Sequence, residues 1–213
     1  HGRKGLPFRC GKSDVHWAAS SATHLCHGLY LALGRYKVAK QMLQGALQLA
    51  LRPETQGNML DVAAVIALEE GDLDLARSLA EDALAKMSTA TCVASCSMTL
   101  GRVYVALGLI EKAVAVLRDA VAIFERAGEG LYLTQALSYL GFALRHMHSI
   151  DEALASSRRA VQLLTSNGGF CFRAQEIYWN HFLILHDAGD PGASKALDTA
   201  YRIVTKQAAQ LGR

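Results

Sequence analysis

The sequence predicts an all-α solenoid of about five stacked helical hairpins. Apolar residues between the glycine-containing breaks recur at i, i+3, i+4 and i+7, which is the helical period. The chain has only 3 prolines, and it lacks the β-branched alternation that is typical of strands. An internal repeat is the third observation, because self-similarity at a nearly fixed period is the sequence signature of a solenoid.

The repeat is anchored on short turns that end in glycine in all units but one. The anchors are Leu33-Gly34, Glu70-Gly71, Leu107-Gly108, Met147-His148 and Ala188-Gly189, and their second members lie 37, 37, 40 and 41 residues apart. Glycine suits such a turn because it adopts a positive φ without strain. His148 breaks this rule, so we expect its turn to be slightly strained or of another type.

Two alanines follow the anchors at fixed offsets of five and twelve residues. In the first four units they are Ala39, Ala76, Ala113 and Ala153, then Ala46, Ala83, Ala120 and Ala160. The fifth unit has Ala193 and Ala200, one residue early in both cases. Residues seven apart lie on nearly one face of a helix. The alanines are therefore predicted to let the second helix of each hairpin approach the first closely.

Each hairpin is expected to have one helix before its anchor and one after it. First helices are predicted at 14–33, 55–70, 90–107, 129–147 and 171–188, and second helices at 35–51, 73–87, 110–127, 150–166 and 192–210. The breaks between hairpins are too short to be domain linkers. We therefore expect one continuous solenoid domain over 14–210, preceded by a flexible segment over 1–13.

The pattern resembles the tetratricopeptide repeat, which has a small residue at position 8, an aromatic at 11, glycine at 15 and alanines at 20 and 27. The third unit matches best, with Gly101, Tyr104, Gly108, Ala113 and Ala120 at these positions. The resemblance covers nearly the whole chain and implies a right-handed solenoid. Because the period exceeds the usual 34 residues, the array also resembles the C-terminal helical arrays of bacterial regulatory ATPases and transcription activators.

Composition excludes several classes of function. Lys and Arg total 22 and Asp and Glu total 19, and this net charge of +3 is too mild to predict nucleic-acid binding. No apolar run is long enough to span a membrane, and no signal peptide is evident. The 5 cysteines suit reduced thiols in a cytoplasm better than disulfides. The chain begins with histidine, so we expect it to be a piece of a longer protein.

No constellation predicts catalysis, a metal or a cofactor. His24, Cys26 and His27, the pair Cys92 and Cys96, and the pair His146 and His148 do not supply the four converging ligands of a zinc site. The stretch from Gly5 to Ser13 resembles a phosphate-binding loop, but its glycine spacing is wrong and no apolar strand precedes it. The acidic pairs Glu69-Glu70 and Glu81-Asp82 are interpreted as solvated charge. The chain is therefore predicted not to be an enzyme.

The predicted function is a scaffold that binds a protein or peptide, which could be another domain of the same polypeptide. The alternative is a ligand-sensing or autoregulatory region of a multidomain bacterial ATPase or transcription regulator. The inner face of a solenoid is lined by the first helices. The partner-binding residues predicted on that face are Asn58, Asp61, Met98, Arg102, Gln135, Phe142, Arg145 and Trp179. Arg102 and Arg145 would suit an acidic segment; alternatively, both pair with acidic residues of neighbouring helices and support the array.

Overall fold

A computed structural model describes residues 34–47, 52–169, 171 and 173–211, together with 18, 21–23, 25, 26 and 31. Every regular element over these ranges is helical, and no strand occurs among them. The predicted flexible segment 1–13 and most of the predicted helix 14–33 lie outside the described residues. The prediction of one domain over 14–210 is therefore not tested at its N-terminal end.

The helices follow one another in consecutive hairpins. They are α2 (Tyr36–Leu47), α3 (Pro53–Glu70), α4 (Leu73–Ala85), α5 (Ala90–Ala106), α6 (Ile110–Ala127), α7 (Gly130–His146), α8 (Ile150–Ser166), α9 (Ala174–Asp187) and α10 (Ala193–Leu211). Where a predicted boundary falls on described residues, it lies within three residues of the observed one. The all-α solenoid of tetratricopeptide-like hairpins is confirmed.

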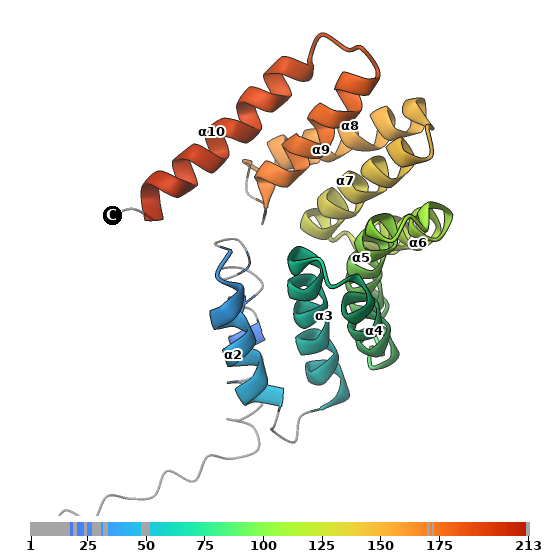
Figure 1. The fold of residues 1–213 in the computed structure, drawn as a ribbon. Coiled ribbons are helices and arrows are strands. Elements are labelled where there is room, and N and C mark those ends of the chain that lie inside the picture. The colour runs from blue at the N-terminus through green and yellow to red at the C-terminus, as the bar shows by residue number, and fades with distance from the viewer. Residues whose placement is uncertain are drawn as a thin grey trace, which may run out of the picture.

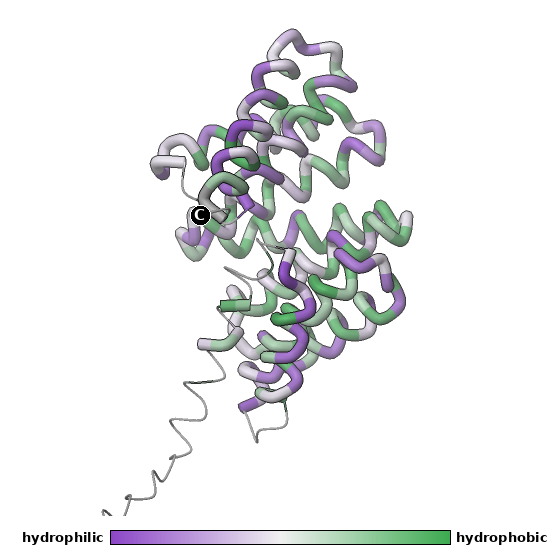
Figure 2. The backbone as a smooth tube through the Cα atoms, turned by 60° about the vertical axis from the view of Figure 1, so that its left-hand side comes forward, coloured by the Kyte–Doolittle hydropathy of each residue, from purple (hydrophilic) through white to green (hydrophobic). Residues whose placement is uncertain are grey.

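The hairpins stack into a curved array with two layers. Within the hairpins α3 packs on α4, α5 on α6, α7 on α8 and α9 on α10, while α3, α5, α7 and α9 also contact one another in succession. Figure 1 shows that the array curves so that α2 and α10 lie at its two ends. Hydrophobic and hydrophilic stretches alternate along the helices in Figure 2, as amphipathic packing requires. The first helices therefore form the inner layer of the curve.

The small residues of the repeat lie where helices approach most closely. All eight alanines at offsets five and twelve of the first four units are buried. In the fifth unit Ala200 is buried, whereas Ala193 is only partly covered. A Cβ atom on Gly101 would lie 2.6 Å from Cγ of Leu117 in α6, which is too close for any side chain to fit without a shift. Close helix approach is thus shown at Gly101, and the burial of the alanines agrees with the role predicted for them.

Four anchor turns have the same geometry, including the one without glycine. In each, the amide of the left-handed residue donates to a carbonyl three residues back, and the next amide donates to a carbonyl five residues back. At the fourth turn these bonds run from His148 to Arg145 O and from Ser149 to Leu144 O, both at 3.0 Å. His148 has φ 57°, compared with 74° for Gly108. The turn is thus of the same type, and His148 adopts a conformation that strains a residue with a Cβ atom.

Replacing His148 with glycine should stabilise the protein by about 1 kcal/mol, because the left-handed conformation costs a non-glycine residue roughly this amount. Chemical denaturation monitored by circular dichroism measures the change. The reciprocal variant Gly108→His provides the control, and it should lose a similar amount. An unchanged or lowered stability for His148→Gly would show that the fourth turn is not strained.

Ala113→Leu should lower the free energy of unfolding by about 1 to 3 kcal/mol, because the larger side chain overpacks the contact between α5 and α6. Ala113 has no exposed surface, whereas Ala115 on the same helix is exposed. Ala115→Leu is therefore the matched control, and its free energy of unfolding should lie within about 0.5 kcal/mol of that of the parent. Equal stability of the two variants would mean that the alanine stripe is not a packing constraint.

Candidate functional site

Two glutamates and two arginines form an ion cluster on the inner layer. Glu69 lies in the last turn of α3, Arg102 on α5, and Arg173 and Glu176 at the start of α9. Arg102 reaches Glu69 at 2.9 Å and Glu176 at 3.5 Å, while Arg173 reaches the same carboxylates at 2.7 and 2.8 Å. The cluster therefore joins three helices, and Arg173 contacts Glu69 across 104 residues of sequence.

Tyr139 of α7 completes this cluster. The guanidinium carbon of Arg102 lies 5.1 Å from the centre of the Tyr139 ring, which is within cation–π range. The Tyr139 hydroxyl lies 3.4 Å from Oε2 of Glu176 and donates to it. Every inner helix from α3 to α9 thus contributes to one polar network.

Burial and charge act in opposite directions on the ionisable groups of the cluster. Burial raises the pKa of Glu69, but the neighbouring Arg173 and Arg102 guanidiniums outweigh it and bring the pKa below its ordinary value. Burial, followed by the charge of Glu176, raises the pKa of Tyr139 to about 12. At neutral pH Glu69 is therefore ionised and the phenol of Tyr139 is protonated.

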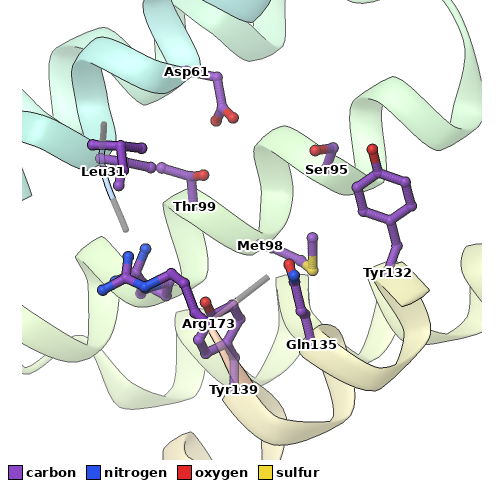
Figure 3. Close-up of a pocket in the computed structure, with 11 residues that line it drawn as sticks. Leu31, Asp61, Ser95, Met98, Thr99, Tyr132, Gln135, Tyr139 and Arg173 are labelled. Atoms are coloured by element: carbon purple, nitrogen blue, oxygen red, sulfur yellow. The ribbon is translucent and has the colours of Figure 1, made fainter. Parts of the chain in front are cut away.

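Asp61 of α3 borders a small cavity beside the cluster. The cavity has a volume of about 30 Å³ and is lined by Leu31, Asp61, Val65, Ser95, Met98, Thr99, Arg102, Tyr132, Gln135, Tyr139 and Arg173. We call it the Asp61 cavity. Figure 3 shows the carboxylate of Asp61 pointing toward the space that Ser95, Thr99 and the side chains of α7 border.

The carboxylate of Asp61 is almost completely buried and incompletely paired. Only 7% of the residue is exposed, and its Oδ1 has no hydrogen-bond partner. Burial raises its pKa from 3.8 to about 6, although hydrogen bonding to Thr99, the charge of Arg102 and hydrogen bonding to Cys96 lower it in part. A buried acceptor without a partner is costly, so this oxygen needs an explanation beyond packing.

A larger, mostly apolar hollow adjoins the Asp61 cavity. Its volume is about 430 Å³, and its lining is Leu68, Arg102, Val105, Ala106, Leu117, Tyr139, Phe142, His146, Glu176, Trp179 and Asn180. We call it the Trp179 hollow. Trp179 is 46% exposed, which is high for the largest apolar side chain. Arg102 and Tyr139 line both spaces and form a shared wall between them.

The structure brings together most of the residues that the sequence predicted for partner binding. Asp61, Met98, Arg102 and Gln135 line the Asp61 cavity, and Arg102, Phe142 and Trp179 line the Trp179 hollow. Their role in binding stays a prediction.

Two of the eight predicted residues line neither space. Asn58 is exposed near the start of α3. Arg145 forms an ion pair of 2.6 Å with Asp187 and thereby lowers the pKa of that carboxyl. Arg102 is also paired, so both arginines show the arrangement that the sequence left open as the alternative to partner binding.

Sequence reasoning missed four members of the polar network, namely Glu69, Tyr139, Arg173 and Glu176. The interpretation of Glu69 as solvated charge was wrong, because its side chain is only 22% exposed and contacts two arginines. The other member of that pair, Glu70, is exposed and pairs with Lys40. Only the period of the inner helices could have indicated Glu69. Its partner Arg102 lies on the next inner helix, whereas Arg173 lies far along the chain.

The described residues hold no group of three or more His, Cys, Asp or Glu side chains that could bind a metal. Cys26, Cys92 and Cys96 are free thiols, and His24, His27 and the stretch from Gly5 to Ser13 lie outside the described residues. None of the described helices combines the length and hydropathy that a membrane span requires. The expected absence of metal and cofactor stays a prediction.

Residues 93–127, which include most of α5, all of α6 and their connecting turn, match the sequence model of the tetratricopeptide repeat family. The chain contains a tetratricopeptide repeat. The match covers the unit in which Gly101, Tyr104, Gly108 and Ala113 carried the resemblance, so the predicted family is confirmed.

Solved structures of similar fold extend over most of this chain. BtubC (BKLC) from P. vanneervenii has a TM-score of 0.64 and 20% identity over 94% of this chain and 84% of its own. Two structures of a Podosopora anserina protein with nearly identical TPR-like repeats, named as a kinesin light chain, have TM-scores of 0.60 and 0.59. They are 18% identical and cover 89% and 88% of this chain and 95% of theirs. No curated protein sequence matches the chain.

The buried carboxyl predicts a specific pH dependence of stability. Because the pKa of Asp61 rises from 3.8 to about 6 on folding, its contribution to stability is fully present below pH 3.8 and is lost as the pH rises through 6. A shift of roughly two units corresponds to about 3 kcal/mol. Urea unfolding between pH 4 and 8 should show Asp61→Asn gaining stability relative to the parent by up to this amount over that range.

The exposed Asp119 of α6 offers the matched control. Asp119→Asn should keep a nearly constant difference from the parent at every pH. If the stability difference between Asp61→Asn and the parent is also independent of pH, burial does not raise the pKa of Asp61 on folding.

Proposed function

We propose that this chain holds a protein or peptide segment against the inner helices of its array, at the Trp179 hollow. The tetratricopeptide repeat and the stacked hairpins form a repeat scaffold for protein interactions. The observation that carries the proposal is the half-exposed Trp179 beside an apolar hollow of about 430 Å³. Such a surface fits an inserted apolar or aromatic side chain, because interface energy concentrates in aromatic residues within pockets.

The walls of the hollow support a specific fit. Asn180 is buried and donates to Oγ of Ser138 at 3.1 Å, which fixes the floor beside Trp179. Phe142 packs edge-to-face on His146 with ring centres 4.8 Å apart. Because these contacts hold the wall residues in place, the partner loses little binding energy to their ordering.

The wider proposal includes the parts that the sequence predicted and that stay untested. The solenoid is one domain over 14–210 with a flexible segment over 1–13, and it is part of a longer cytoplasmic polypeptide. It binds a protein, a peptide or another domain of that polypeptide, through the eight inner-face residues named from the sequence. It catalyses no reaction, holds no metal or cofactor, and contacts neither nucleic acid nor membrane.

A second candidate is a ligand-sensing region in a multidomain bacterial ATPase or transcription regulator. The volume of the Trp179 hollow favours it, since small-molecule sites commonly measure about 300 to 1,000 Å³ and are mostly apolar. An ATPase module encoded next to this segment in the full-length gene would support this candidate over a free-standing scaffold.

Selection of peptides from a random library on the immobilised chain tests the main proposal. The chain has 2 tryptophans, so in a Trp17→Phe background the fluorescence of Trp179 reports occupancy directly. Selected peptides should share an apolar or aromatic residue. Phe142→Ala should lower the affinity of the selected peptides by about tenfold or more, because removing an aromatic side chain from a binding pocket typically costs this much.

Tyr201 of α10 is 69% exposed and lines no part of the hollow, so Tyr201→Ala is the control and should change affinity less than twofold. Melting curves would exclude unfolding of the Phe142 variant. Selected peptides that respond to Tyr201→Ala and not to Phe142→Ala, or a library that yields none, would contradict the proposal.

A further inference from the structure

The arginines that line the Asp61 cavity are paired with carboxylates other than Asp61. Arg102 and Arg173 line the cavity, whereas their partners Glu69 and Glu176 lie outside its lining. The arginines are engaged with Glu69 and Glu176 at 2.7 to 3.5 Å. They therefore leave Oδ1 of Asp61 without a hydrogen-bond partner.

Among the described residues, the thiol and the phenols near this carboxylate supply no positive charge. Cys96 shares the interior with Asp61, and burial together with the Asp61 charge raises the pKa of its thiol, which therefore stays neutral. Tyr132 and Tyr139 line the cavity with phenol pKa values raised first by burial, so they stay protonated. The charge of Arg102 thus compensates the Asp61 carboxylate only in part, and Oδ1 of Asp61 stays open to a donor.

The lining of the Asp61 cavity suits a ligand nitrogen that carries several hydrogens and can donate several hydrogen bonds. Ser95 and Thr99 from α5 bring hydroxyl oxygens to the same space as the Asp61 carboxylate from α3. Figure 3 shows these side chains converging from different helices, with Tyr132 and Gln135 on the α7 side. An ammonium group offers three donors and a positive charge, which matches a carboxylate surrounded by neutral oxygens.

The size of the cavity restricts the ligand further. One water needs roughly 10 to 15 Å³ of such volume, so about 30 Å³ admits a group the size of two waters. An ammonium on a narrow methylene stem is small enough for this space, which favours it over the bulkier guanidinium or an aromatic ring. Because Arg102 and Tyr139 wall both spaces, a ligand seated in the Trp179 hollow lies next to the Asp61 cavity.

We propose that the Asp61 cavity binds one primary ammonium group of the ligand, either a lysine side chain of a peptide or the amine of a small molecule. Asp61 accepts the charge-assisted hydrogen bond through Oδ1, and the hydroxyls of Ser95 and Thr99 accept from the remaining N–H donors. The inference rests on the proposed function only in taking the inner helices as the binding surface.

Methylammonium chloride is the first probe, because it contains the proposed group and nothing else. At pH 7.5 and constant ionic strength, millimolar methylammonium should raise the melting temperature of the full chain by a measurable, saturable shift. Tetramethylammonium, which has no N–H donor, and sodium should give no such shift. The shift should disappear in Asp61→Asn, shrink in Thr99→Val, and persist in the control Asp119→Asn.

Peptide selection on the parent and on Asp61→Asn is the second arm, and it distinguishes the two ligand sources. A peptide source predicts lysine at a fixed distance from the apolar residue for the parent, and loss of that lysine for Asp61→Asn with the apolar residue retained. A methylammonium shift without lysine enrichment assigns the site to a small amine.

Each remaining outcome has a single meaning. Apolar peptides without lysine, together with no methylammonium shift, would overturn the ammonium site and leave the proposed function standing. A methylammonium shift when no peptide is selected would support the ammonium site and contradict the proposed function. An equal shift with sodium would show a plain monovalent-cation site and overturn the inference. Circular dichroism of Asp61→Asn confirms that the variant is folded, so loss of the shift reports the missing carboxylate.

Discussion

The close approach of the two helices in each hairpin is the constraint on which the rest of the structure depends. It requires a small residue wherever one helix crosses the other, and Gly101 shows how strict this is, since a Cβ atom there would meet Leu117. It also requires a left-handed residue between the helices, which even His148 adopts. Because the hairpins from α3 to α10 share the geometry of their turns, they stack in a regular way. That regularity produces the curve and thereby the inner surface.

The ion cluster follows from this curvature. Only a curved stack brings the end of α3 to the start of α9, where Glu69 meets Arg173 across 104 residues. Partly covered charges are stable when they are paired and unstable when a partner is removed. The cluster therefore acts as a cross-link between distant hairpins, and it holds the shared wall of the two spaces in a fixed position. Asp61 lies just beyond it and obtains no such partner for Oδ1.

Local features made most of the fold predictable. Helical periodicity, glycine at the turns and alanine at fixed offsets are encoded within each repeat, so the helix boundaries of α3 to α10 agree with the sequence prediction to within three residues. The same periodicity placed Asp61, Arg102 and Trp179 on the inner face, since that requires only the register of one helix. The fold class and the wall residues thus depend on short-range information.

The pairing of those residues depends on long-range geometry and was not predictable. Both arginine partners of Glu69 come from other hairpins: Arg102 lies on α5 of the next hairpin, and Arg173 approaches only because the curve brings the start of α9 close to α3. Arg145 illustrates the same limit, because its partner Asp187 lies on a helix 42 residues away. An inner-face position is therefore a necessary condition for binding and not a sufficient one. For each candidate binding residue, the charged side chains that the curvature of the array brings close to it must also be considered.

This comparison changes the kind of partner that the inner face suits. Read alone, Arg102 and Arg145 favour an acidic segment, because a guanidinium pairs well with carboxylates. In the folded chain both are already satisfied, and an incoming carboxylate would have to displace Glu69, Glu176 or Asp187. An incoming cation displaces no hydrogen bond at Oδ1 of Asp61, which has no partner. The electrostatic preference of the Asp61 cavity thus depends on this buried carboxylate, and not on the arginines, which other carboxylates already engage.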